Sequence, residues 1–316
     1  MTCLVSIDWG GTSLRAAFIG RNGLIGTSTM PAANIRTLSD ERLNEIKENL
    51  ARQTENIEFQ ELKWLVGAAG AADTKAAERV KSCLLSISPK GSSCDVYPDY
   101  ICNHASALGG NDGIISVNGT GSLLFAEFGH EHMRLGGWGY LLDEIPSGAY
   151  FGKLVLTCVL DFLEGNSSCK TIYDVYEMNM HPPDRSYILD RLYQAGNIQN
   201  HLGSFSKILT TSYDLGDATA QALVNASVER LIDMISRVIE SFPATEQANL
   251  SFCGGLWENW PTFYNIVNSA ITDRNLKITM HEPEYKNLFG PLIQKGKTDK
   301  LAASLFKKIP DKEKKR

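Results

Sequence analysis

Two glycine-rich stretches, each preceded by an apolar run, are the parts of this sequence best suited to binding an anion. The first reads Asp8-Trp-Gly-Gly-Thr12 and follows Cys-Leu-Val-Ser-Ile. The second reads Gly119-Thr-Gly-Ser122 and follows Ile-Ile-Ser-Val-Asn. Glycines let backbone N–H groups approach a ligand closely, and the hydroxyl groups add further donors. Each stretch therefore predicts either a phosphate-binding turn at the end of a strand or an ordinary tight turn.

Two carboxylates stand where chemistry beside such turns would need them. Asp8 leaves the first predicted strand just before Gly10 and Gly11, a position from which a carboxylate can hold Mg²⁺ through water. Asp99 follows Val-Tyr-Pro, so it stands at a strand end and at a helix start, where exposed N–H groups favour a carboxylate. The alternatives are an exposed Asp in a plain hairpin and a simple N-cap. The Gly-x-x-x-x-Gly-Lys pattern of a Walker loop is absent.

Length and composition indicate a globular protein with about two domains. The chain has 316 residues, of which 43% are hydrophobic and 21% charged. The net charge of -5 argues against nucleic acid or an acidic membrane as a partner. No apolar run approaches the roughly 20 residues that span a bilayer.

The cysteines and the N-terminus indicate a compartment. Seven cysteines, an odd number, are scattered along the chain without Cys-x-x-Cys or zinc-like spacing. The N-terminus carries no basic region and no cleavage-like site. These features predict a reduced, cytoplasmic protein with buried thiols.

Periodicity places the main elements around these motifs. Residues 3–19 are predicted as two strands joined by the first glycine turn, and an amphipathic helix capped by Ser39 follows. Residues 152–244 are predicted to be mostly helical, with Asp217 capping the longest helix. The lysine-rich tail after Pro310 is predicted to be disordered and solvated.

Taken together, the motifs resemble those of the actin-like ATPase superfamily of sugar kinases. Within it the sequence is similar to the N-acetylglucosamine kinase branch, the BadF/BadG/BcrA/BcrD ATPase family. That family opens with Asp-x-Gly-Gly-Thr and has a catalytic Asp after a strand, some way before Gly-Thr-Gly-Ser; Asp99 occupies that place. Gly136-Gly-Trp-Gly139 and Ser147-Gly148 match the family's next signature.

The resemblance implies an α/β fold of two ribonuclease-H-like domains with an interdomain cleft. The first would span residues 1–109 and the second residues 110–316, with a helical insertion. The last helix would pack either within the second domain or back on the first.

The resemblance also implies roles for individual residues. Asp99 would be the catalytic base, and Asp8 would position Mg²⁺ through water. ATP phosphates would be bound by Gly10, Gly11, Thr12, Gly119, Thr120 and Gly121, and adenosine by Gly254 and Gly255. The sugar-binding residues would be Asn34, Asp99, Ser122, Gly137, Trp138, Asp143 and Glu144. The alternatives with a purely structural role are a turn-forming Asn for Asn34 and a core Trp for Trp138.

The implied activity is ATP-dependent phosphorylation of a sugar hydroxyl, with N-acetylglucosamine or glucosamine as acceptor. Two departures leave the acceptor open: Leu123 stands where relatives often have Asn, and Asp143-Glu-Ile-Pro146 replaces Gly-Asp-Glu-Gly. The opening also resembles 2-dehydro-3-deoxygalactonokinases, so a sugar acid is one alternative. A degenerate ATP-binding regulator is another, and the family's dehydratase activators rank last because no cluster-binding cysteine pair is evident. A homodimer is considered among the partners, besides the sugar and ATP.

Overall fold

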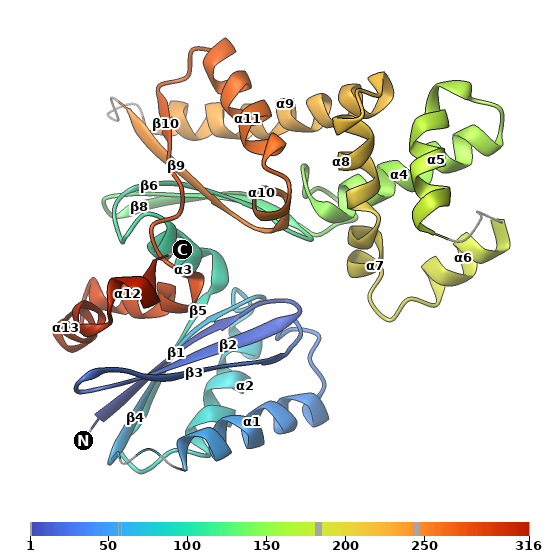
Figure 1. Ribbon diagram of the computed structural model, residues 1–316. Helices are drawn as coiled ribbons and strands as arrows, with labels where there is room; N and C mark the ends of the chain where they lie inside the picture. Colours follow the sequence, from blue (N-terminus) through green and yellow to red (C-terminus); the bar gives the residue numbers. More distant parts are fainter. Residues whose placement is uncertain (1, 56, 58, 181–184, 243–246, 316) are drawn as a thin grey trace. The chain divides into compact units, whose positions relative to one another are not determined.

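The computed structural model describes residues 2–55, 57, 59–180, 185–242 and 247–315. They form two compact units (Figure 1). Unit 1 comprises residues 1–112 together with residues 282–316, and unit 2 comprises residues 113–281. The division near residue 112 lies close to the predicted boundary at 109/110, whereas residues 282–316 group with unit 1 rather than with unit 2.

None of the helices described here is both long and apolar enough to cross a membrane.

Unit 1 is built on a five-stranded sheet in the order β3-β2-β1-β4-β5. Its strands are β1 (Thr2–Trp9), β2 (Ser13–Gly20), β3 (Gly23–Pro31), β4 (Glu61–Ala68) and β5 (Ser93–Pro98). β1, β2 and β3 form an antiparallel meander, and β4 and β5 are added in parallel on the other side of β1. The predicted strand pair across the first glycine turn is therefore confirmed.

Alternation along β1 gives the sheet of unit 1 two apolar faces. Cys3, Val5 and Ile7 pack with helices α1 (Asp40–Thr54) and α2 (Thr74–Leu85). The even-numbered residues face the other side, where Leu4 packs in a second cluster with residues of α3 (Asp99–Ala107), α12 (Gly290–Gly296) and α13 (Lys300–Lys308). The predicted cap of α1 is confirmed, because Ser39 Oγ accepts the N–H of Arg42.

The prediction of a disordered tail after Pro310 is wrong. Residues Asp311–Lys314 form the short helix α14. Lys314 is 6% exposed, its ammonium lies 4.8 Å from the centre of the Phe306 ring, and its carbonyl accepts the N–H of Lys286. The aliphatic stem of a lysine can be buried against an aromatic ring while its charge stays paired, here with Asp311, so a lysine-rich sequence need not be solvated.

Unit 2 repeats the strand order of unit 1. Its sheet runs β10-β9-β6-β7-β8, with strands β6 (Gly113–Asn118), β7 (Ser122–Phe128), β8 (Glu131–Gly136), β9 (Ala248–Cys253) and β10 (Ile278–Met280). β6, β7 and β8 are again antiparallel neighbours, and β9 and β10 are again parallel additions. The Gly119 turn thus joins β6 and β7, the strands of unit 2 that are equivalent to β1 and β2, which the Gly10 turn joins in unit 1.

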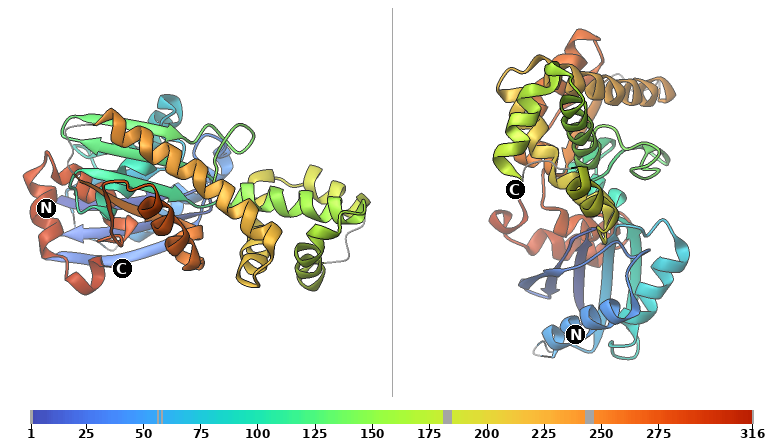
Figure 2. Two further views of the ribbon diagram at one scale, coloured as in Figure 1. Left: turned by 90° about the horizontal axis from the view of Figure 1, so that it is seen from above. Right: turned by 90° about the vertical axis from the view of Figure 1, so that its right-hand side faces the viewer.

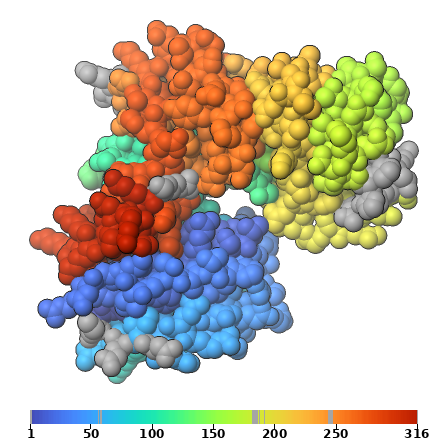
Figure 3. Space-filling model, viewed as in Figure 1, coloured from blue at the N-terminus to red at the C-terminus, as the bar shows by residue number. Residues whose placement is uncertain are grey.

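Helices fill the connection between β8 and β9, as predicted. They are α4 (Gly148–Leu163), α5 (Lys170–Asn179), α6 (Arg185–Tyr193), α7 (Ile198–Ser204), α8 (Ser206–Asp214) and α9 (Ala218–Ser241). In Figure 2, left, α9 lies across the sheet, while α4 to α7 extend away from it; Figure 3 shows this helical part in green and yellow. The Asp217 cap is confirmed by its bond to the N–H of Ala220. Residues 181–184 and 243–244 of the predicted helical stretch lie outside the described residues.

After β9 come α10 (Gly255–Asn259) and α11 (Thr262–Asp273). Trp257 and Trp260, which follow the second glycine pair, are buried in the core of unit 2.

Candidate functional site

The first glycine turn of unit 1 is open and offers unused donors. Gly10 N donates to Ser13 O, which closes the turn between β1 and β2. Among the described residues, no hydrogen bond uses the N–H groups of Gly11 and Thr12. A methyl group at Gly11 would meet no atom within 4 Å. The turn therefore presents two backbone donors to solvent, as an anion-binding nest requires.

Strand register brings Asp8 and Asp99 to one edge of the sheet. Asp8 pairs with Gly67 of β4, and Gly67 pairs with Tyr97 of β5, two residues before Asp99. Because the carboxyl ends of parallel strands meet at one edge, both carboxylates lie there, separated by a single strand. Asp8 is an even-numbered residue of β1, so it faces the side of the sheet on which α3 packs.

The Cys102 thiol fills the space between these two carboxylates. A methyl group at Gly67 would lie only 2.8 Å from Cys102 Cβ and Sγ, so Cys102 lies over β4, the strand between β1 and β5. Burial, and after it the charges of Asp99 and Asp8, raise the pKa of the Cys102 thiol well above its ordinary value. The thiol is therefore neutral and packs as an apolar group.

Local structure separates Asp99 from a simple cap. Pro98 occupies the N-cap position of α3, and Asp99 is its first residue, whose Oδ1 accepts the N–H of Tyr100. The Asp8 side chain is 15% exposed and lies 3.9 Å from the Arg15 guanidinium, so it is not the exposed Asp of a plain hairpin.

Asn34 has a structural role in its own loop. Its Oδ1 accepts the N–H of Arg36, and a methyl group at Gly70 would lie 2.2 Å from that oxygen. The side chain thus closes an Asx turn against Gly70, which has a φ of +94°. The turn-forming alternative is present, and its assignment as a sugar ligand stays a prediction.

The second glycine turn, in unit 2, is closed in by its surroundings. Gly119 N donates to Gly121 O, and the first N–H groups of α4 donate to the turn's carbonyls: Gly148 N to Gly119 O and Ala149 N to Thr120 O. No hydrogen bond of the described residues uses the N–H groups of Thr120 and Gly121. Ser122 begins β7 and is buried. The turn keeps two backbone donors at the end of β6.

Asn118, just before this turn, holds three segments together. It is 1% exposed. Its Oδ1 accepts Trp257 Nε1–H at 2.8 Å and Ser116 Oγ–H at 2.6 Å, and its Nδ2 donates to Pro146 O at 2.8 Å. The three bonds of this buried amide fix its partners closely, because breaking any one of them leaves a buried polar group without that partner. Asn118 therefore positions the turn against α10 and the loop before α4.

The glycine pair Gly254-Gly255 lies directly against the second turn. A methyl group at Gly119 would lie 3.9 Å from both Gly254 Cα and Gly255 N. Gly254 has a φ of +106°, and a methyl group there would lie 2.6 Å from the carbonyl carbon of Asn118. Only glycine fits this backbone approach. The two stretches predicted to bind phosphate and adenosine are thus neighbours within unit 2.

The loop from Gly136 to Pro146 leaves Trp138 at the surface. Trp138 is 76% exposed, so the core-Trp alternative is wrong. The backbone N–H of Trp138 donates to Asp143 Oδ1 at 3.0 Å, and Gly137 O accepts Arg134 Nη2–H at 2.7 Å. Asp143 therefore stabilises the loop that presents the indole ring.

Glu144 lies against the second turn. A methyl group at Gly121 would lie 2.6 Å from Glu144 Oε2, and that oxygen accepts Gln199 Nε2–H at 2.8 Å. Burial, and after it the Asp143 carboxylate, raise the pKa of Glu144 to about 7. Its φ of +77° is a strained value for a residue with a side chain. Of the two candidate carboxylates, Glu144 is the one at the turn.

The residues present fit ATP and Mg²⁺. Each turn has two unused N–H donors; at Gly11 the approach is clear, whereas at Gly121 the Glu144 carboxyl group lies close, and the Gly254 pair places backbone without side chains beside the second turn. The described residues hold no cluster of three or more His, Cys, Asp or Glu side chains suited to a metal. A single carboxylate such as Asp8 is nevertheless compatible with Mg²⁺, which keeps several waters and takes other ligands from phosphates.

Sequence reasoning missed three residues that shape these sites. Asn118 ends a predicted strand directly before a glycine turn, and an amide side chain at that place is a signal that the sequence contains. Cys102 carries no signal, because its position over Gly67 follows from packing. Gln199 lies in α7, far along the chain from Glu144, and only the structure brings the two together.

Comparisons with known proteins agree with this arrangement. The BadF/BadG/BcrA/BcrD ATPase family profile matches residues 5–290. No curated protein matches the chain significantly. A Chromobacterium violaceum protein, provisionally assigned as an N-acetylglucosamine kinase, superposes with a TM-score of 0.75 at 18% identity, over 92% of this chain and 98% of that one.

Two further solved structures share the fold. A provisional N-acetylglucosamine kinase of Porphyromonas gingivalis has a TM-score of 0.69 at 18% identity, covering 93% of this chain and 98% of its own. A ROK family glucokinase of Streptomyces griseus, solved with glucose and AMPPNP, has a TM-score of 0.56 at 12% identity, covering 95% and 99%. At such identities these likenesses show the fold, an α/β architecture of two domains. The family match spans both units and every motif described above, and the chain belongs to the BadF/BadG/BcrA/BcrD ATPase family.

Proposed function

We propose that this protein is an ATP-dependent kinase that phosphorylates a hydroxyl group of an amino sugar, N-acetylglucosamine or glucosamine. The observation that carries the proposal is the carboxyl edge of the unit 1 sheet. There Asp8, near the end of β1, and Asp99, directly after β5, follow strands that are separated only by β4, beside a glycine turn with two unused N–H donors. A pure nucleotide-binding site needs no second carboxylate at that place.

Each residue set has a role in this reaction. The N–H groups of the Gly10 and Gly119 turns bind phosphate oxygens, and the Gly254 pair leaves room for adenosine. Asp8 would hold Mg²⁺ through water, and the ion would neutralise phosphate charge. Asp99 accepts the proton of the sugar hydroxyl. As it does so, the hydroxyl oxygen of the sugar forms a bond to the γ-phosphorus, and the bond between that phosphorus and the β,γ-bridging oxygen of ATP breaks. Positioning and charge neutralisation supply most of the rate in such a transfer.

The sugar assignment rests on the loop of unit 2. The exposed indole of Trp138 offers a flat apolar face of the kind on which the C–H face of a sugar stacks. Glu144, at the turn, offers a carboxyl oxygen to a hydroxyl. Two structural relatives carry provisional N-acetylglucosamine kinase assignments, which supports the amino sugar as acceptor. We further propose that the protein acts in the cytoplasm, and that any homodimer leaves these sites complete in one chain.

The test is sugar-dependent ADP formation from ATP and Mg²⁺. The acceptors are N-acetylglucosamine, glucosamine, N-acetylmannosamine, glucose and 2-dehydro-3-deoxygalactonate, with a no-sugar control. We expect the highest kcat/KM with one of the first two. Phosphorylation of 2-dehydro-3-deoxygalactonate alone would show that the acceptor is a sugar acid and not an amino sugar. ATP binding without turnover on any sugar would replace the kinase by an ATP-binding regulator.

A further inference from the structure

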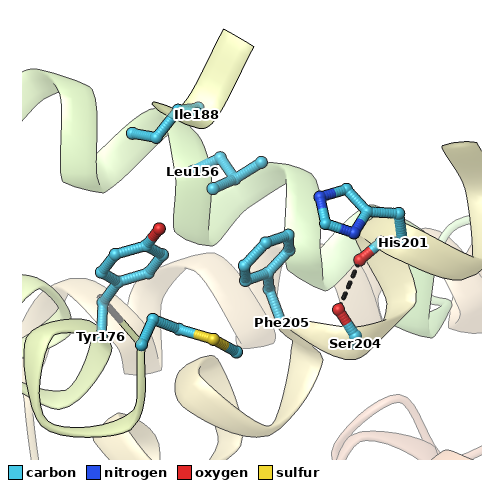
Figure 4. Close-up of a pocket in the computed structure, with 7 residues that line it drawn as sticks. Leu156, Tyr176, Ile188, His201, Ser204 and Phe205 are labelled. Atoms are coloured by element: carbon cyan, nitrogen blue, oxygen red, sulfur yellow. Dashed lines mark hydrogen bonds between the residues drawn. The ribbon is translucent and has the colours of Figure 1, made fainter. Parts of the chain in front are cut away.

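A cavity of about 200 Å³ lies in the helical part of unit 2 and is separate from the turns described above (Figure 4). Four helices and the residues following two of them line it. The lining residues are Leu156, Tyr176, Met180, Ile188, His201, Ser204 and Phe205. The floor is buried, with Leu156, Tyr176, Ile188 and Phe205 each less than a tenth exposed, and Ser204 lies at the exposed rim.

The shape and chemistry of the cavity select a narrow class of ligand. A buried apolar cavity of about 150 Å³ is large enough to bind benzene, so this one accommodates a single ring with a small substituent. Its aromatic groups are arranged around Phe205: the Tyr176 ring is stacked at 6.0 Å and the His201 ring meets it edge-on at 5.0 Å. In Figure 4 the Tyr176 hydroxyl and the His201 ring border the same space as Leu156 and Ile188. These groups suit an aromatic ring carrying one hydrogen-bonding substituent.

Helix α7 has the cavity on one face and the candidate site on the other. His201 and Ser204 border the cavity, whereas Gln199 and Gly203 lie on the opposite side of this helix. Gln199 Nε2 donates to Glu144 Oε2 at 2.8 Å. A methyl group at Gly203 would lie 3.4 Å from Thr120 Cγ2, so the helix also packs on the second glycine turn.

The same helix packs tightly on α4. A methyl group at Gly152 of α4 would lie 1.7 Å from Leu202 O, so the two backbones touch and α7 cannot move toward α4. A ligand in the cavity would contact α7 at His201 and Ser204, and the same helix makes the Gln199 contact to Glu144.

We infer that the cavity is a regulatory site for a small monocyclic aromatic molecule with one polar substituent, and that α7 couples its occupancy to Glu144 and the Gly119 turn. The regulatory part rests on the proposed function, because Glu144 and the turn are the proposed substrate and nucleotide contacts. The binding part stands on the cavity alone.

Binding is tested by saturation-transfer NMR with phenol and benzyl alcohol as probes. Leu156→Phe fills the cavity, and Leu160→Phe, one turn along α4 and 37% exposed, is the matched control. We expect the wild type and Leu160→Phe to bind a probe, and Leu156→Phe to bind it at least tenfold more weakly. Ser204→Phe, at the exposed rim, blocks the entrance without altering the core and serves if Leu156→Phe does not fold. Failure of both probes to bind the wild type, or undiminished binding in the filled variant, overturns the proposal.

Coupling is tested by calorimetric titration of Mg·ATP with and without saturating probe. We expect at least a threefold change in ATP affinity, mirrored in the affinity for the probe because coupling is reciprocal. Gln199→Leu, which cannot donate to Glu144, is expected to bind the probe normally and lose the change. Equal ATP affinity with and without probe, or coupling that persists in Gln199→Leu, contradicts the role of α7. A protein that shows coupling but phosphorylates no sugar refutes the proposed function, and with it the regulation of a kinase, but leaves the binding of the probe and its coupling to ATP standing.

Discussion

The two units of this protein have the same strand order, yet they furnish the equivalent turn differently. In unit 1 Asp8 lies two residues before Gly10, and the turn itself is open, with nothing within 4 Å of a methyl group placed at Gly11. In unit 2 the residue two before Gly119 is the apolar Val117, the buried amide Asn118 directly precedes the turn, and the turn is enclosed by α4, α10 and Glu144. Unit 1 thus has a carboxylate beside an open turn, whereas unit 2 has neutral backbone N–H donors in an enclosed turn.

This difference indicates a division of labour. Asp99 follows the last parallel strand of unit 1, where the equivalent residue after β10 in unit 2 is His281, whose Nε2 bonds Asn249 Oδ1. Unit 1 therefore has the carboxylates to which we assign proton transfer and metal binding in the proposed function. Unit 2 has the close backbone approach, at Gly119 and Gly254, that a nucleotide needs. The predictions below test that division.

The largest expected effect is on turnover when Asp99 is changed. Asp99→Asn keeps an oxygen for the N–H of Tyr100 but cannot take a proton, so sugar phosphorylation should fall by about 100-fold or more at an unchanged melting temperature. The matched control is Asp95→Asn in β5, the strand that precedes Asp99; this change removes an ion pair with Lys295 and should keep most activity. Steady-state kinetics decide, and an Asp99→Asn enzyme with near wild-type kcat would refute its assignment as the base.

The second effect is on stability at the glycine pair. Gly254→Ala forces a side chain onto a φ of +106° and against the backbone of Asn118, so it should cost about 2 kcal/mol or more. Gly216→Ala has a φ of +82° but no atom within 4 Å, and it should cost only the backbone strain of about 1 kcal/mol. Urea unfolding of the two variants separates strain from overlap. Equal losses would show that the close approach to Asn118 is unimportant.

The third effect concerns pH. The folded protein raises the pKa of Glu144 to about 7, so it holds this proton more tightly than the unfolded chain does. The stability that this group contributes is thus fully present below the pKa of an unfolded Glu and is lost as the pH rises through about 7. Glu144→Gln cannot ionise, so its melting temperature relative to wild type should increase between pH 5 and pH 8. Glu131→Gln, at an exposed position of β8, should show no such trend. A pH-independent difference for Glu144→Gln would contradict the buried position of its carboxyl group.

The smallest effect is expected at the sugar loop. Trp138 is exposed, and its backbone N–H rather than its indole ring bonds to Asp143. Trp138→Ala keeps this bond and should therefore leave folding intact. Loss of the stacking face should raise the KM for the sugar several-fold and leave the KM for ATP unchanged. Trp138→Phe should restore part of the sugar affinity. Equal changes in both KM values would show that the indole does not contact the sugar.

Sequence alone predicted the parts of this protein that depend on local chemistry. Gly-Gly and Gly-Thr-Gly at strand ends predicted both turns, and Ser39 and Asp217 were recognisable caps because side-chain capping acts over three residues. The identity of the fold followed from the order of the motifs.

The rest depended on contacts between distant segments. The C-terminal helices pack on Leu4 and Leu65 of unit 1, which no local pattern indicates. Burial of Lys314 depends on the Phe306 ring, and the environment of Glu144 depends on Gln199 from another helix. Tertiary packing overrides composition in each case.

The division of labour is tested most directly by the affinity for Mg·ATP of two variants, measured by calorimetry. A methyl group at Gly119 would make only ordinary contacts, at 3.9 Å, so Gly119→Ala should fold normally while its methyl group narrows the space beside the Gly254 pair. We predict that Gly119→Ala binds Mg·ATP at least tenfold more weakly than wild type and that Asp99→Asn binds it within twofold of wild type. The reverse pattern, with Asp99→Asn losing affinity and Gly119→Ala keeping it, would contradict the account.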